Sequence, residues 1–232
     1  MENLTYDLKD GVATITMDDG KANAFSTAMF EAVNAAFDRA EAEAKIIVFR
    51  GRDGIFSGGY DLKELAQGGP RALALVRRGS ELVVRMMECP LPVISVGTGH
   101  VVAMGAFIFL GADYRIGVDG KFKVGLPETA NGLPMHNFGR EMGVAKLAKT
   151  YFSRAFINGE MYAPKDAVAV GYLDKVVSAD DLDAAVDEAT TYFKSISLDA
   201  FKLNKPMGYK TLLPILKQAI EDDFDPAKGP TL

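Results

Sequence analysis

Two short, mainly apolar runs constrain the fold of this chain more than any other feature. They are Ile46–Phe49 and Leu91–Val96. A strand that is apolar at successive positions has no face to turn toward water, so both of its faces must be covered. Each run follows a helical stretch, the first over about 26–44 with Ser26 as a candidate N-cap and the second near 70–89. This alternation predicts an α/β fold.

Further elements fit the same pattern. Residues 12–17 alternate polar and apolar side chains as a half-buried strand does, residues 103–112 indicate a buried helix, and 114–118 a short strand. Beyond about residue 140 the strand signal fades. Two late amphipathic helices follow, which carry Leu182, Val186, Ala189 and Phe193, and Leu212, Leu213, Leu216, Ala219 and Ile220.

Pro214 interrupts the second of these helices, so it is expected either to kink the helix or to limit it to its first turn. We expect a core over residues 1–180 and a helical C-terminal region over 181–232, either part of the same domain or an appended arm. The apolar faces of the late helices suggest that this region mediates self-association, because such faces cannot all meet one core.

Composition excludes several classes of protein. The formal charge of −5 argues against nucleic acid as the main partner, which would require a basic face. The single cysteine, Cys89, cannot form an intramolecular disulfide, and no Cys/His pair has zinc-ligand spacing, so we expect no metal site and a reduced compartment. The longest apolar stretch, Val101–Ala112, is too short to span a bilayer, and the N-terminus does not resemble a signal peptide. A cytoplasmic location fits these features.

Two glycine-bearing segments stand where a strand gives way to a helix. They are Gly54–Lys63, with the pair Gly58-Gly59, and Gly99–Phe107, in which small residues open an apolar helix. Glycine lets the backbone approach a ligand closely, and the first turn of a helix has N–H groups without intrahelical partners. Taken alone, the first segment favours a plain turn, and the second is also consistent with close helix packing.

Glu128 is the candidate proton-transfer group. It lies in Val124–Glu128, which is followed by Asn131–Pro134, so that one carboxylate sits in a loop rich in glycine and proline with apolar neighbours. Desolvation of a carboxylate raises its pKa and makes it a usable general acid or base near neutral pH. A solvated surface glutamate is the alternative.

These three segments, in this order, resemble the signatures of the crotonase superfamily, the enoyl-CoA hydratase/isomerase family. The resemblance implies a spiral of ββα turns and an oxyanion hole of two backbone N–H groups. In the motif Phe-x-x-Gly-x-Asp-Leu, similar to residues 56–62, the first N–H maps onto Gly58. The second N–H, in the segment similar to residues 99–113, maps onto Met104, or onto Gly105 after a shift of one residue.

The resemblance also implies an acyl-CoA substrate, with coenzyme A belonging to the substrate and no separate cofactor, and a homotrimer or dimer of trimers. The early segment of the family that lines the CoA groove is similar to residues 21–25. Its later helix and strand are similar to residues 158–177. We therefore expect substrate contacts from Lys21, Ala22, Ala24, Ser57, Gly59, Tyr60, Asp61, Leu62 and Gly105. Within this set, Asp61 is expected to brace its loop rather than touch the ligand.

One departure from the family pattern bears on the reaction. Hydratases of the family carry a second catalytic glutamate in the helix-opening segment, where this chain has Phe107, whereas the Pro127-Glu128 pair is retained. In hydration, two carboxylates share the work of moving a proton to carbon and of holding and deprotonating the water. Moving a double bond needs only one base. The sequence therefore favours Δ3 to Δ2 enoyl-CoA isomerisation. A hydratase, and a non-catalytic protein that binds acyl-CoA or a partner, are the alternatives.

Weaker candidates have simpler explanations. The two histidines are His100 and His136, and His136 could share the pocket of Glu128 or be a surface or core residue. Cys89 lacks a visible base and is expected to be a small buried residue. The basic residues Arg77, Arg78, Lys63 and Lys202 could meet the CoA phosphates or be solvated charges.

Overall fold

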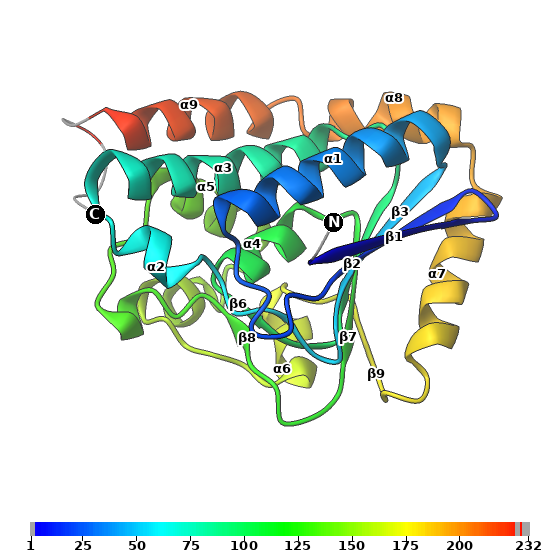
Figure 1. The fold of residues 1–232 in the computed structure, drawn as a ribbon, viewed down its shortest axis with the longest axis horizontal. Helices are drawn as coiled ribbons and strands as arrows, with labels where there is room; N and C mark the ends of the chain where they lie inside the picture. Colours follow the sequence, from blue (N-terminus) through cyan, green and yellow to red (C-terminus); the bar gives the residue numbers. More distant parts are fainter. Residues whose placement is uncertain (1–2, 226–227, 229–232) are drawn as a thin grey trace.

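Two β-sheets organise the chain in the computed structural model, which describes residues 3–225 and 228 (Figure 1). The larger sheet has the order β1-β2-β3-β5-β7-β9, with β1 and β2 antiparallel and the other pairs parallel; the smaller sheet, β4-β6-β8, is parallel. The strands are β1 (Leu4–Lys9), β2 (Val12–Met17), β3 (Ile46–Gly51), β4 (Gly54–Ser57), β5 (Val93–Gly97), β6 (Gly99–Val102), β7 (Tyr114–Val118), β8 (Val124–Gly125) and β9 (Lys175–Val177).

From β3 onward, successive strands alternate between the two sheets, which confirms the predicted spiral of ββα turns. The pairs β3 and β4, β5 and β6, and β7 and β8 each place one strand in the larger sheet and one in the smaller, and a helix follows each pair. The helices are α1 (Thr27–Glu43), α2 (Leu62–Leu65), α3 (Gly69–Glu88), α4 (Met104–Gly111), α5 (Asn137–Lys146), α6 (Pro164–Val170), α7 (Leu182–Ser195), α8 (Leu198–Gly208) and α9 (Leu212–Phe224).

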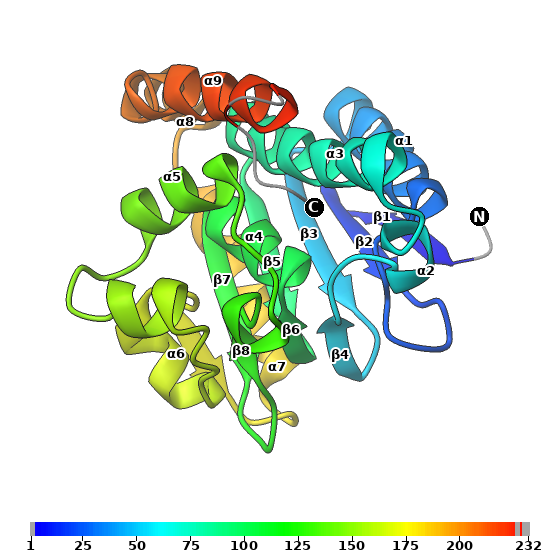
Figure 2. The same cartoon turned by 90° about the vertical axis from the view of Figure 1, so that its left-hand side faces the viewer.

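The larger sheet is covered on both faces, as its apolar strands require. Alternate residues of one strand point to opposite sides: Ile47 and Phe49 of β3 join a core shared with α1, α3 and α4, whereas Ile46 and Val48 join a second cluster against α7. Figure 1 shows α8 and α9 on the outer side of α3, and α7 on the opposite side of the sheet. The fourth helix, α4, lies beneath α3 and next to β6 (Figure 2), so the glycine segments are held between rigid layers.

The predicted strands and helices are confirmed, and the residues that motivated the self-association prediction pack within the chain. Leu216 and Ile220 of α9 lie in the first core, and Leu182 and Phe193 of α7 lie in the second cluster. Other apolar side chains of the late helices are exposed, namely Tyr192, Leu203, Met207 and Ile215. Association into trimers stays a prediction. The predicted region 181–232 reaches beyond the described residues at 226–227 and 229–232.

Pro214 lies in the first turn of α9, which begins at Leu212 and continues to Phe224, so the proline does not limit the helix to its first turn. A proline in a first turn lacks an N–H that would have had no intrahelical partner. Among residues 3–225 and 228, no helix is both long enough and apolar enough to cross a membrane.

A buried ion pair ties the C-terminal region to the sheet. Lys205 of α8 is 8% exposed, and its Nζ lies 2.6 Å from Oδ2 of Asp113 and 3.0 Å from the Met86 carbonyl. Asp113 Oδ2 also accepts the N–H of Val93 in β5 at 2.8 Å. Burial raises the pKa of Asp113, and Lys205 opposes this effect. The lysine therefore compensates a carboxylate that would otherwise be costly to bury.

We predict that Lys205→Met lowers the free energy of unfolding by about 3–5 kcal/mol, because it leaves Asp113 buried without its counter-charge. Urea denaturation followed by circular dichroism measures this difference. Lys217→Met is the matched control, since the Lys217 and Glu88 pair is exposed and such pairs contribute about 0–1 kcal/mol. Equal losses in the two variants would contradict the prediction.

Candidate active site

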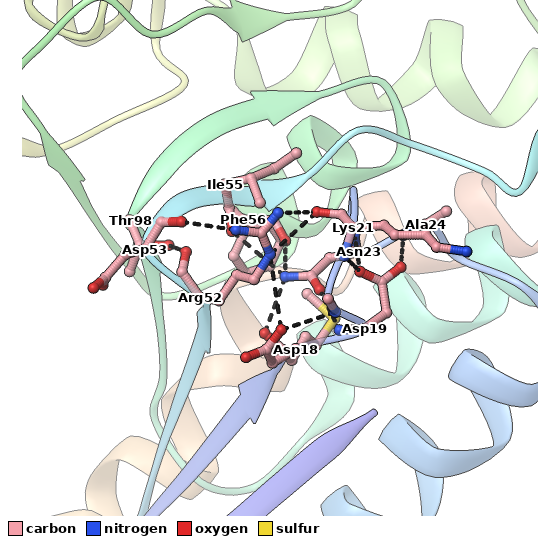
Figure 3. Close-up of polar contacts among 12 residues, drawn as sticks. Asp18, Asp19, Lys21, Asn23, Ala24, Arg52, Asp53, Ile55, Phe56 and Thr98 are labelled. Atoms are coloured by element: carbon pink, nitrogen blue, oxygen red, sulfur yellow. Dashed lines mark hydrogen bonds and ion pairs between the residues drawn. The ribbon is translucent and has the colours of Figure 1, made fainter. Parts of the chain in front are cut away.

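Asn23 joins the early segment, residues 21–25, to the first glycine segment, Gly54–Lys63 (Figure 3). Its side chain is fully buried, and Nδ2 donates to the carbonyls of Met17 at 3.0 Å and Phe56 at 3.1 Å. Its Oδ1 accepts the N–H of Asp19 at 3.0 Å. The residue has a φ of 48°, and asparagine tolerates this left-handed conformation better than most residues do. One amide thus fixes the ends of β2 and β4 against each other.

Backbone hydrogen bonds then run along the two segments. The N–H of Gly58 donates to the Ala22 carbonyl at 2.9 Å, and the N–H of Phe25 donates to the Gly59 carbonyl at 2.8 Å. The N–H of Asp61 donates to the Phe25 carbonyl at 3.1 Å. This differs from the sequence prediction for Gly58. Its N–H has a partner within the chain and is not free for a substrate oxygen.

The second glycine segment packs directly against the first. A Cβ on Gly59 would lie 2.9 Å from the Cβ of Ala103 and 3.8 Å from the nitrogen of Met104, and a Cβ on Gly105 would lie 3.0 Å from the Cβ of Ser57. Contacts that short leave no room for a larger side chain. The two segments that the sequence analysis singled out therefore meet at the N-terminus of α4.

Ala103, the residue before α4, has a φ of 52°. Such a conformation in a residue other than glycine costs about 1–3 kcal/mol and persists only where the surroundings enforce it. The strained turn directs the chain from β6 into α4, and the nitrogen of Met104 lies close to Gly59.

N–H groups without partners gather at this junction. Within the described part of the chain, no hydrogen bond is donated by the N–H of Tyr60, Met104 or Gly105. The carbonyl of the Gly59–Tyr60 peptide points toward Phe25, and in a trans peptide the N–H points the opposite way. The Tyr60 N–H therefore points away from the early segment. Tyr60, rather than Gly58, supplies the free N–H of the first segment.

Glu128 is desolvated, as the sequence analysis expected. It follows β8 and precedes a short 3-10 turn at Thr129–Asn131, and its Oε2 is buried with no hydrogen-bond partner among the described residues. Burial raises the pKa of Glu128 to about 7. At neutral pH a carboxyl group with this pKa is populated in both its protonated and its ionised form. A group that accepts a proton and later returns it needs both forms.

Glu128 lies within electrostatic reach of the first segment. Burial raises the pKa of the Tyr60 hydroxyl, and the charge of Glu128 and then that of Asp223 add to this effect. Phe107 is almost fully buried, with its ring edge-on to His136 at 5.5 Å between centroids. The Nε2 of His136 is buried without a partner among the described residues, and burial lowers the pKa of this imidazole. The position of the second hydratase carboxylate is therefore occupied by apolar packing.

Several predicted contact residues have roles within the chain. The carboxylate of Asp61 caps α2, accepting the N–H groups of Lys63 at 2.8 Å and Glu64 at 2.9 Å, so it braces its loop as expected. The hydroxyl of Ser57 is buried and bonded to the backbone, which leaves it unable to face a ligand. By contrast, Leu62 is largely exposed.

The residues predicted to contact CoA lie in a loop that charged groups hold in place. Asp19 accepts the N–H groups of Lys21 at 2.7 Å and Ala24 at 3.2 Å, and Arg52 donates to the Lys21 carbonyl (Figure 3). Lys21 and Ala22 are themselves exposed, and their contact with CoA stays a prediction.

The weaker candidates from the sequence have partners within the chain, are buried, or are exposed to solvent. His100 accepts the N–H of Lys123 at 3.1 Å. Cys89 is buried, which raises the pKa of its thiol to about 11. On α3, Arg77 pairs with Glu81 and Glu221, and Arg78 pairs with Glu31. Lys63 and Lys202 are exposed.

Three groups at or near the candidate site were not predicted from the sequence. They are the buried amide of Asn23, the N–H of Tyr60, and Asp223, which accepts the N–H groups of Asn137 at 2.6 Å and Phe138 at 3.0 Å. Asn23 carried a usable signal, because it follows the Asp-Asp-Gly run 18–20, a composition typical of turns that need left-handed residues. Asp223 carried no such signal, since its partners come from another part of the chain.

We predict that Glu128 titrates with a midpoint of about 7, far above the ordinary value of 4.5. Carbon-13 NMR of glutamate side-chain carboxyl groups in the labelled protein measures the midpoint directly, and Glu128→Gln assigns the signal by removing it. Glu160 is an internal reference, because Arg154 holds its pKa below the ordinary value. A Glu128 signal that moves together with that of solvated glutamates would contradict the burial argument.

Comparison with known proteins identifies the family and supports the fold. The enoyl-CoA hydratase/isomerase family model matches residues 7–224. A crystal structure of an enoyl-CoA hydratase/isomerase family protein from Pseudomonas syringae is 45% identical, with a TM-score of 0.93 over 95% of this chain and 96% of that one. An enoyl-CoA isomerase from Mycobacterium tuberculosis is 30% identical, with a TM-score of 0.89 over 95% and 96% of the two chains. A probable enoyl-CoA hydratase of Bacillus subtilis is 26% identical over 92% of this chain and 87% of its own length. The chain belongs to the enoyl-CoA hydratase/isomerase family.

Proposed function

We propose that the protein moves the double bond of an enoyl-CoA thioester from the Δ3 to the Δ2 position, with Glu128 as the single proton carrier. The observation that carries this proposal is the pairing of one buried carboxyl group, of pKa about 7, with an aromatic ring at the position of the second hydratase carboxylate. Relatives named as isomerases and as hydratases occur at comparable identity, so the choice rests on these residues.

The proposed reaction uses Glu128 twice. Its carboxylate removes a proton from the α carbon, breaking a C–H bond, and the electron pair moves into the dienolate with negative charge on the thioester oxygen. The protonated Glu128 then returns the proton to the γ carbon, and the double bond is left between the α and β carbons. A carboxyl group with a pKa near the working pH is suited to both steps.

The dienolate oxygen would be held by the N–H groups of Tyr60 and Met104. Both lack partners within the described chain, and both lie where the two glycine segments meet. Preorganised donors of this kind contribute about 2.7–4 kcal/mol each to transition-state stabilisation in a site that excludes water. Gly105, one position into α4, is the alternative second donor, and Gly58 is excluded by its bond to Ala22.

A hydratase would need a second group to hold and deprotonate water. Phe107 has no ionisable atom, and burial lowers the pKa of the neighbouring His136 imidazole, which makes it a weaker base. Both features favour isomerisation over hydration. The CoA moiety would lie along the loop of Lys21, Ala22 and Ala24.

We predict that Glu128→Gln lowers kcat for trans-3-enoyl-CoA by a factor of roughly 10²–10⁴ with little change in acyl-CoA binding, because the amide keeps the shape but cannot accept the proton. Steady-state kinetics and calorimetry measure the two quantities. The wild type should isomerise trans-3-enoyl-CoA faster than it hydrates trans-2-enoyl-CoA.

Glu160→Gln is the matched control, because Glu160 pairs with Arg154 at the surface and its loss should leave kcat unchanged. Faster hydration than isomerisation by the wild type would overturn the isomerase assignment. An unimpaired Glu128→Gln variant would overturn the mechanism, and acyl-CoA binding without turnover of either substrate would favour a non-catalytic binding protein.

A further inference from the structure

We propose that the hydroxyl of Ser57, held by the backbone of Asn23, is the positioning group that directs the Tyr60 N–H toward the thioester oxygen. The inference rests on the proposed function, since it concerns how one of the two oxyanion donors is oriented. Ser57 and Asn23 act through the backbone and do not touch the substrate.

The hydroxyl of Ser57 makes two hydrogen bonds in opposite senses. It donates to the Asn23 carbonyl at 2.8 Å and accepts the N–H of Gly59 at 3.1 Å. The side chain is fully buried, so water cannot replace either bond without entering the packed junction. Two segments that lie 34 positions apart in the sequence are thereby joined through one oxygen atom.

Gly59 needs such a constraint because its own conformation is permissive. Its φ is 109°, in a region that glycine enters as readily as the ordinary one, so the chain at this point has several accessible directions. Ser57 fixes the N–H of Gly59, and Phe25 fixes its carbonyl at 2.8 Å. With both sides held, the Gly59–Tyr60 peptide has one orientation, and the Tyr60 N–H points away from the early segment.

Asn23 supplies the rigid end of this arrangement. Its carbonyl can hold Ser57 because its buried amide is itself held by Met17, Phe56 and Asp19 (Figure 3). Loss of the Ser57 hydroxyl would leave the buried N–H of Gly59 without its acceptor, so that the following peptide is held only through the Gly59 carbonyl. A less firmly directed donor stabilises the dienolate less, while the loop of Lys21, Ala22 and Ala24 keeps its hydrogen bonds to Asp19 and Arg52.

The test compares Ser57→Ala with Ser95→Ala. Ser95 is an equally buried serine in β5 whose hydroxyl has no hydrogen-bond partner among the described residues, so its loss removes the same atom without breaking a bond. For Ser57→Ala we expect kcat on trans-3-enoyl-CoA to fall about tenfold or more, with KM changed by less than about threefold. The reason is that the variant loses stabilisation of the transition state rather than substrate binding. Ser95→Ala should match the wild type, and Ser57→Cys should fall between because a thiol is a weak donor and acceptor.

A spectroscopic readout separates orientation from stability. The infrared carbonyl stretch of a bound saturated acyl-CoA, labelled with carbon-13 at the thioester, should shift to lower frequency in the wild type and shift less in Ser57→Ala. Asn23→Gly, which keeps the left-handed backbone but removes the amide, should show the same reduced shift. Thermal melting confirms that each variant is folded at the temperature of the measurement.

A wild-type carbonyl shift and kcat in folded Ser57→Ala would overturn the inference, as would a fall in activity that follows only the folded fraction. The saturated thioester cannot isomerise, so this readout does not depend on the reaction. A carbonyl shift in the wild type without isomerase activity would sink the isomerase assignment alone, and the variants would still decide the positioning role. Absence of any shift in the wild type would reject the oxyanion site and the inference with it.

Discussion

The close approach of the Gly59 loop to the N-terminus of α4 is the constraint on which the rest of the site depends. A side chain at Gly59 would collide with Ala103, and one at Gly105 would collide with Ser57. The spiral of strands brings these segments together, because β4 and β6 pair in the smaller sheet and each leads into one of them. The larger sheet and its covering helices supply the rigidity, whereas the smaller sheet aligns the site.

Stability and chemistry are opposed at this junction. The φ of 52° at Ala103 and the buried, unpartnered carboxylate oxygen of Glu128 both cost folding free energy. The surrounding core offsets these costs, and the buried pair of Lys205 and Asp113 ties the last helices to the sheet. In return, the site gains donors that need no reorganisation and a carboxyl group whose pKa lies near neutrality.

The parts of the fold that sequence could predict are those determined by local patterns. The two apolar runs became β3 and β5, and Ser26 caps α1 as its position indicated. Strand β1 was not predicted, although Asp10-Gly11 is a strong hairpin signal in sequence. In the structure both residues have positive φ, as a tight two-residue turn between β1 and β2 requires. The desolvation of Glu128 was predictable from its apolar, glycine- and proline-rich surroundings.

The site details that sequence could not predict depend on distant partners. Whether an N–H is free is decided by the carbonyl it meets, and Gly58 meets Ala22 from another part of the chain. Likewise, the late helices are visibly amphipathic, but nothing local shows that their apolar faces would meet this chain's own cores. Sequence thus identified the segments, and tertiary contacts decided which atoms are available.

The central claim is that one carboxyl group carries the proton from the α to the γ carbon. The most direct test is to follow the label from trans-3-enoyl-CoA that carries deuterium at the α carbon, with mass spectrometry and NMR of the product. The account predicts trans-2-enoyl-CoA with part of the deuterium on the γ carbon, because Glu128 holds the abstracted nucleus in a buried site between the two steps. A product with no deuterium on the γ carbon, or a 3-hydroxyacyl-CoA as the main product, would contradict it.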